Sequence, residues 1–294
     1  MTNSFRDVYT FMPQYFSLLC KTQIEEIYAD NNNFVEAFVN EEFFMLPSTL
    51  KVCDFANNRL LKFHFGMPYL LTLNLRNNLL GVYLSTKRYT NSSKTNLREV
   101  ELSFNFIQNL SFTVLHGYVN TIKIILSNNK ISDLKFDLSH LTSSEKLDLS
   151  CNNISGITSQ KSMDTLHKIS KTSKLKIYLS NNLLKCRCQN LHFLQWLEAN
   201  FDMFINRNNY MFQFDNNDVV HLTNVQEIVK QLEKECSSFC ITIGIITACI
   251  ILAAGLMFRF RWRLRYLYYM TRHKYNVFKS IQSSDTYKYD AFIS

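Results

Sequence analysis

An eleven-residue frame recurs along the first two thirds of the chain. The frame is L-x-x-L-x-L-x-x-N-x-L, with other apolar residues accepted at the leucine positions. It fits seven times, although the first position is polar in the last three copies, and successive starts lie 26, 20, 27, 24, 23 and 30 residues apart. A repeat spacing of this size predicts stacked units, because one short unit cannot bury its own apolar face. The copies begin at Ile24, Leu50, Leu70, Leu97, Thr121, Ser144 and Lys174.

The ninth position of the frame is asparagine in every copy. The chain has only 6 Gly and 3 Pro, so asparagine takes over the turn positions. This residue tolerates the left-handed backbone region and bonds locally to the main chain. We therefore expect each of these side chains to satisfy backbone groups inside a bend. These repeat asparagines are Asn32, Asn58, Asn78, Asn105, Asn129, Asn152 and Asn182.

The middle apolar residues of each frame, such as Leu73 and Leu75, alternate like a short strand with one buried face. The pattern resembles the leucine-rich repeat family. The resemblance implies an α/β fold over residues 24–185, a curved solenoid with a parallel inner sheet and an asparagine ladder. Its exposed strand positions become candidates for ligand recognition, with a solvated polar face as the alternative. Examples are Arg98, Glu99, Glu101 and Phe104 in one repeat, and Thr72, Asn74 and Arg76 in another.

Residues 186–239 follow the last repeat and begin with Cys-x-Cys at Cys186 and Cys188. Together with the amphipathic stretch that follows, this resembles the C-terminal cysteine cap of extracellular leucine-rich repeat proteins. A third cysteine usual in such caps is missing here. The resemblance implies a disulfide from Cys186 or Cys188 to Cys236, with Cys240 either a further candidate or placed at the membrane interface. The expected inward face of the amphipathic stretch is Leu191, Leu194, Trp196 and Leu197.

Residues 240–258 contain 18 consecutive uncharged residues, Ile241 to Phe258, about the minimum for a helix that spans a bilayer. The basic segment 259–286 follows at once and opens with Arg259, Arg261, Arg263 and Arg265. From Arg259 onward there are eight Lys/Arg and two Asp/Glu, so most of the net charge of +8 lies here and does not indicate a nucleic-acid surface on the repeats. Positive charge favours the cytoplasmic side, so we expect residues 1–239 outside.

Three N-glycosylation sequons lie in the predicted exterior, at Asn91, Asn109 and Asn153. The segment 1–23 has neither a long apolar core nor a small-residue cleavage site, so it is a poor signal peptide. An exterior domain needs a route across the membrane. We therefore expect that the natural N-terminus lies upstream of this sequence.

The last eight residues, 287–294, end on Tyr289, Asp290, Ala291, Phe292, Ile293 and Ser294. Repeats, cysteine cap, one apolar segment, a basic flank and this hexapeptide together resemble a Toll-like receptor. In that family an aromatic-Asp-Ala-Phe-Ile-Ser strand opens the cytoplasmic Toll/interleukin-1 receptor domain. The resemblance implies that only the first strand of that domain is present, so the sequence is a fragment or a truncated receptor.

The resemblance implies a single-pass type I receptor of innate immunity, in the plasma membrane or an endosome. It would bind a microbial or endogenous ligand, pair with a like or different receptor, and recruit adaptors only with a complete signalling domain. The alternative is a non-signalling adhesion or decoy receptor. We expect no enzyme, cofactor or metal, because the seven histidines are scattered and neither a nucleophile–base set nor a phosphate loop is present.

Overall fold

The structure, a computed structural model, describes residues 10–11, 22–37, 47–63, 68–86, 95–111, 114–115, 117–215, 217–221 and 225–284. The chain divides into two compact units, Met1–Glu233 and Lys234–Ser294. Asn91 and the hexapeptide from Tyr289 to Ser294 lie outside the described residues.

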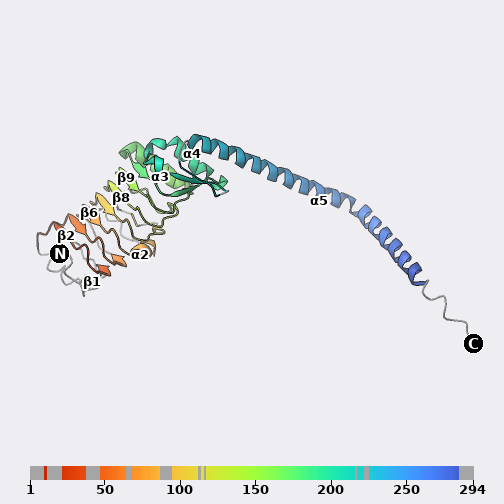
Figure 1. Cartoon of the computed structure of the whole chain (residues 1–294), viewed down its shortest axis with the longest axis horizontal. Coiled ribbons are helices and arrows are strands. Elements are labelled where there is room, and N and C mark those ends of the chain that lie inside the picture. The colour runs from red at the N-terminus through yellow and green to blue at the C-terminus, as the bar shows by residue number, and fades with distance from the viewer. Residues whose placement is uncertain are drawn as a thin grey trace, which may run out of the picture. The chain divides into compact units, whose positions relative to one another are not determined.

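An eight-stranded parallel sheet forms one side of the first unit (Figure 1). In each of the seven frames the strand covers the third to fifth positions, and the fourth, an apolar residue, is its centre. The centres pair in register from Ile27 through Cys53 to Ile177. The predicted leucine-rich repeat solenoid is therefore confirmed. The strands in spatial order are β2 (Glu26–Tyr28), β4 (Val52–Asp54), β6 (Thr72–Asn74), β7 (Glu99–Glu101), β8 (Lys123–Ile125), β9 (Lys146–Asp148), β10 (Lys176–Tyr178) and β12 (Phe204–Ile205).

The repeat asparagines join neighbouring units through main-chain atoms. The Asn78 amide nitrogen donates to the carbonyls of Leu75 and Arg76 in its own bend and to that of Phe55 one repeat back, at 3.0, 3.2 and 2.9 Å. Its oxygen accepts the amide of Leu60, also one repeat back, at 3.0 Å. The same pattern of bonds to the preceding repeat is made by Asn58, Asn105, Asn129, Asn152 and Asn182.

The residue just before each repeat asparagine has a left-handed backbone, with φ between 52° and 57° in all seven repeats. Five of these residues are asparagine, which tolerates that region. The exceptions are Phe104 and Cys151. Phe104 is exposed and carries the guanidinium of Arg76 over its ring, 4.9 Å from the centroid.

Replacing Phe104 by asparagine should stabilise the chain by about 0.5–1 kcal/mol, because the left-handed backbone then costs less while one exposed cation–π contact is lost. Urea unfolding followed by circular dichroism measures the change. The reciprocal variant Asn77→Phe, at the same position one repeat earlier, should destabilise by a similar amount. Equal stability of both variants and the parent would show that the backbone conformation carries no cost here.

The segments that precede or connect the strands of this sheet include a smaller sheet and two helices. β1 (Thr10–Phe11), β3 (Glu36–Ala37) and β5 (Lys62–Phe63) form a small parallel sheet. Helix α2 (Gly81–Thr86) lies across the solenoid from β6, and α3 (Gln160–Ser173) follows β9 (Figure 1). The Ser159 side chain caps α3 by accepting a hydrogen bond from the amide of Ser162, and α3 buries one apolar stripe.

Gly81, the first residue of α2, touches the main chain of the next repeat. A Cβ atom there would lie 2.4 Å from the carbonyl oxygen of Phe106. Gly81→Ala should therefore lower the free energy of unfolding by about 2–3 kcal/mol, because backbone has to move. Gly244→Ala, inside helix α5 where a Cβ would meet nothing within 4 Å, is the matched control and should not lower the stability. A silent Gly81→Ala would mean that the two repeats are not so closely packed.

The C-terminal part of the first unit closes the sheet through β12. Its helix α4 (Leu191–Ala199) buries Phe193, Leu194 and Leu197, while Trp196 is half-buried with its ring edge-on to Phe204. Leu191 is half-buried too, so Phe193 takes the place expected for it in the inward face. The remaining elements are β11 (Leu183–Lys185), η1 (Cys188–Asn190), η2 (Phe201–Met203), η3 (Arg207–Asn209), β13 (Met211–Gln213) and β14 (Val219–His221).

After the last repeat, a tyrosine hydroxyl takes the place of one main-chain acceptor. In the preceding repeat, the amide of Leu149 donates to the carbonyl of Tyr178 on the next strand, at 2.9 Å. After β10 the equivalent amide, that of Leu179, donates to the hydroxyl of Tyr210 at 3.3 Å, and this hydroxyl donates to the carbonyl of Ile205 at 3.2 Å. Burial raises the pKa of Tyr210 well above its ordinary value, so the hydroxyl keeps its proton.

Helix α5 (Val225–Ser284) contains 60 residues. Its start packs in the first unit through Val225, Ile228, Val229 and Leu232, at helical spacing. Among the described residues it is the one helix long and apolar enough to cross a membrane. The expected span 240–258 lies within it and is exposed throughout.

Candidate ligand-binding face of the solenoid

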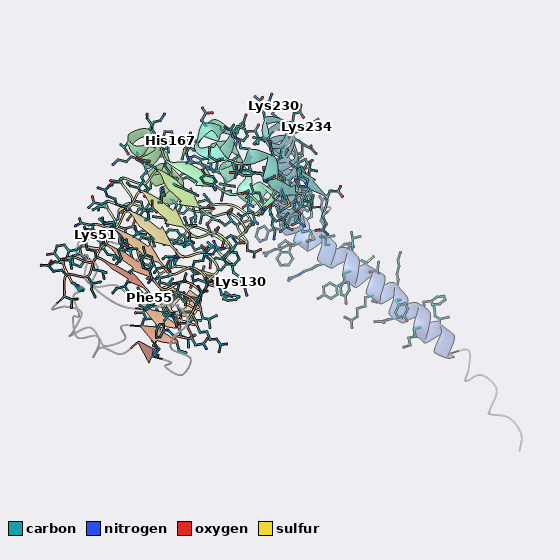
Figure 2. All side chains as sticks on the ribbon, turned by 60° about the vertical axis from the view of Figure 1, so that its left-hand side comes forward. Lys51, Phe55, Lys130, His167, Lys230 and Lys234 are labelled. Atoms are coloured by element: carbon teal, nitrogen blue, oxygen red, sulfur yellow. The ribbon has the colours of Figure 1, made fainter. Side chains whose placement is uncertain are left out.

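The side chains at the third and fifth frame positions form the solvent-facing side of the eight-stranded sheet. Burial alternates along each strand, as in β6, where Leu73 is 2% exposed and lies between the half-buried Thr72 and Asn74. Lys51, just before β4, lies on this solvent-facing side, whereas Phe55 is fully buried within the solenoid (Figure 2). Two parallel rows of side chains are therefore available to a ligand.

The row at the fifth position supports the bends. An Asp54 carboxylate oxygen accepts the amide of Ala56 at 2.8 Å, and Glu101 accepts the amide of Ser103 at 2.9 Å. The Asn74 side chain donates to Asp54 on the neighbouring strand at 2.9 Å. These candidate recognition residues therefore also hold the turns, which limits their freedom to move toward a ligand.

The row at the third position changes charge along the sheet. Glu26 and Glu99 occupy it in the first and fourth repeats. In the last three repeats it holds Lys123, Lys146 and Lys176, which pair directly across β8, β9 and β10. Like charges directly opposite each other destabilise a sheet, so we expect each of the three lysines to have a partner that offsets this repulsion.

Each lysine of this row has a partner within the protein. Lys123 forms a salt bridge with Glu99 on the neighbouring strand at 2.5 Å, and that carboxylate raises the pKa of Lys123. Lys146 lies 3.4 Å from Asp148 and 4.7 Å from the centroid of the Tyr178 ring. Lys176 donates to the carbonyl of Asp202 at 2.9 Å. Lys123 and Lys146 are thus next to carboxylates, whereas the partner of Lys176 is a neutral carbonyl.

This lysine row is not among the recognition candidates expected from the sequence. Its signal was present, because the third residue of the fifth, sixth and seventh frames is lysine. The candidates chosen from the third and fourth repeats are spread along the same face, with Thr72 and Asn74 on β6 and Glu99 and Glu101 on β7. Arg98 lies exposed just before β7.

Cys188 and Cys236 are disulfide-bonded, whereas Cys186 and Cys240 are thiols. Cys186 is buried, and burial together with nearby Asp215 raises its pKa to about 12, so the thiol is protonated and unreactive at neutral pH. Asn109 and Asn153 are exposed, as glycosylation requires. Among the described residues no group of three His, Cys, Asp or Glu side chains could hold a metal ion.

The repeated frame, the parallel sheet and the asparagine bonds define a leucine-rich repeat protein. The fold is similar to the crystal structure of human 5T4 (Wnt-activated inhibitory factor 1, trophoblast glycoprotein), with a TM-score of 0.56 over 75% of this chain and 81% of that chain at 16% identity. No protein-family model matches the sequence.

The chain is a homologue of the Toll-like receptors. It is 31% identical over 289 residues to Toll-like receptor 4 of Pinctada imbricata, across 92% of this chain and 32% of that protein. The chain thus spans about a third of the length of this curated relative. Because 92% of 294 residues is about 270, more than the 233 of the first unit, the similarity extends into the helical second unit.

Proposed function

We propose that this chain acts as part of a single-pass pattern-recognition receptor of Toll-like type in innate immune signalling. The observation that carries the proposal is the similarity to a Toll-like receptor through both the solenoid and the long apolar helix. The solenoid would bind an extracellular microbial or endogenous ligand. Ligand-dependent pairing with a like or different receptor would bring cytoplasmic signalling domains together, and these would recruit adaptors.

The proposed topology is type I, with the solenoid outside the cell or inside an endosome. It is supported by the basic residues after Phe258, which favour the cytoplasmic side, and by the exposed sequons at Asn109 and Asn153. An epitope tag at the N-terminus should be stained on intact cells, or after endosomal opening, and glycosidase should increase the mobility of the chain. A tag reached only through the cytosol would contradict this topology.

We also propose that Cys188 and Cys236 are bonded to each other. Both are disulfide-bonded, and five of the other six cysteines are thiols, which leaves only Cys20 outside the described residues. One remaining cysteine cannot serve two partners. Such a bond would tie the start of α5 to the end of the repeats, and an oxidising exterior would maintain it.

The signalling step can be tested with a chimera in which the cytoplasmic part of the Pinctada imbricata receptor follows the span. Microbial extracts should increase chain pairing, measured by energy transfer between labelled copies, and should also raise the output of a transcriptional reporter.

Lys146→Glu, with Lys168→Glu on α3 as a matched exposed control, tests whether the lysine row contributes to recognition. Binding of an extract component without pairing would favour the decoy alternative instead.

A further inference from the structure

Arginines on α5 just beyond the apolar stretch stack on aromatic rings. The guanidinium of Arg261 lies 5.2 Å from the ring centroid of Phe258 and 5.3 Å from that of Trp262. Arg265 lies 5.6 Å from the same Trp262 ring. All three distances are within the range of cation–π attraction. One indole therefore holds two guanidinium groups.

The spacing places these two arginines together. Arg261 and Arg265 are four residues apart, so they are neighbours on one face of the helix. Stacking restrains a guanidinium through its face and leaves the N–H donors at its edge for hydrogen bonding. Two restrained guanidiniums next to each other match the several oxygens of a phosphate group.

The part of α5 that follows Phe258 provides no anion for these groups. From Arg259 to Ser284 the sequence has seven Lys/Arg and no Asp or Glu. Two like charges one helical turn apart repel each other, and this cost is removed when an anion binds between them. An external anion is therefore required to neutralise the pair.

We propose that Arg261 and Arg265, restrained by Trp262, form a binding site for the phosphate of an anionic phospholipid headgroup. The site lies one turn after the uncharged stretch that ends at Phe258, the depth at which headgroups lie next to a spanning helix. Tryptophan also favours that depth. The proposal rests on the membrane insertion of α5 in the proposed function.

Fluorescence quenching of Trp262 tests the site in the full chain. The sequence has two tryptophans, so Trp196→Phe leaves Trp262 as the only one. This variant is reconstituted in nanodiscs of phosphatidylcholine with a minor fraction of phosphatidylserine, and either one lipid or the other is brominated. Brominated phosphatidylserine should quench more than its fraction predicts, with an enrichment of about fivefold for each arginine that contacts it.

The matched variants compare equal changes of charge. Arg261→Gln with Arg265→Gln should reduce the enrichment to that of the bulk mixture, while Lys274→Gln with Lys279→Gln should leave most of it. Equal loss in both double variants would overturn the site in favour of diffuse attraction. Loss of the enrichment on adding inorganic phosphate would overturn the lipid as ligand. Circular dichroism of each variant confirms that α5 remains helical.

The failure of insertion has a different signature. If α5 does not cross the membrane, neither brominated lipid quenches Trp262, and the proposed function fails with the site. Quenching by both lipids in proportion to their fractions would leave insertion standing and overturn the headgroup site alone.

Discussion

Replacement of Asn129 by alanine is expected to lower the free energy of unfolding by about 3–5 kcal/mol. Its oxygen accepts the amides of Asn105 and Ile107 at 2.9 and 3.0 Å, and its nitrogen donates to three carbonyls. Alanine would leave these buried backbone groups without their partner, and each such group costs about 1–3 kcal/mol. Urea unfolding of the purified chain in detergent micelles, followed by circular dichroism, measures the loss.

Two further variants identify the cause. Asn129→Asp keeps the shape but replaces the donor with an acceptor that faces three carbonyls, so it should be at least as destabilising as alanine. Asn33→Ala, at an exposed asparagine of the first repeat, is the control and should change stability by less than about 0.5 kcal/mol. If Asn129→Ala behaved like Asn33→Ala, the ladder would not be a main source of cohesion between repeats.

Removal of the proposed disulfide is expected to have an effect of similar size. Cys188 to Cys236 would close a loop of 49 residues, and restricting such a loop in the unfolded chain is worth about 4 kcal/mol. Cys236→Ser should therefore lower stability by about that amount in oxidised protein, whereas the parent treated with reductant should lose the same amount. Unfolding with and without reductant measures both.

The partner is identified with a control thiol. Cys240→Ser changes an exposed thiol only four residues away and should be silent. Peptide mapping under non-reducing conditions should give one linked pair of fragments that contain Cys188 and Cys236. A linked fragment that contains Cys186 or Cys20 would refute the proposed pairing.

The strand centres and bends could be predicted from sequence because one residue type serves one geometric need in every repeat. Leu73 must face inward between two outward residues, and Asn78 must reach carbonyls in its own bend and in the preceding repeat. Phe104 shows where such reasoning fails, since an aromatic residue occupies a left-handed position that sequence rules assign to asparagine or glycine.

The end of the solenoid could be predicted only in outline. The Cys-x-Cys and the amphipathic stretch indicate a cap, but the choice of Phe193 over Leu191 for the interior depends on how α4 meets β12. Nothing in the local sequence indicates that the Tyr210 hydroxyl accepts a hydrogen bond from the amide of Leu179, because that contact spans 31 residues. The lysine row could be predicted from sequence, because lysine is the third residue of the last three frames.

The bonds of Asn78 have an evolutionary consequence. The hydrogen bonds of its amide group described above all go to carbonyl and amide groups of the main chain. Every polypeptide offers those groups, so one unit can be duplicated, lost or exchanged without a matching mutation in its neighbour. Selection can then rewrite the outward residues of each unit separately, at little cost to the scaffold.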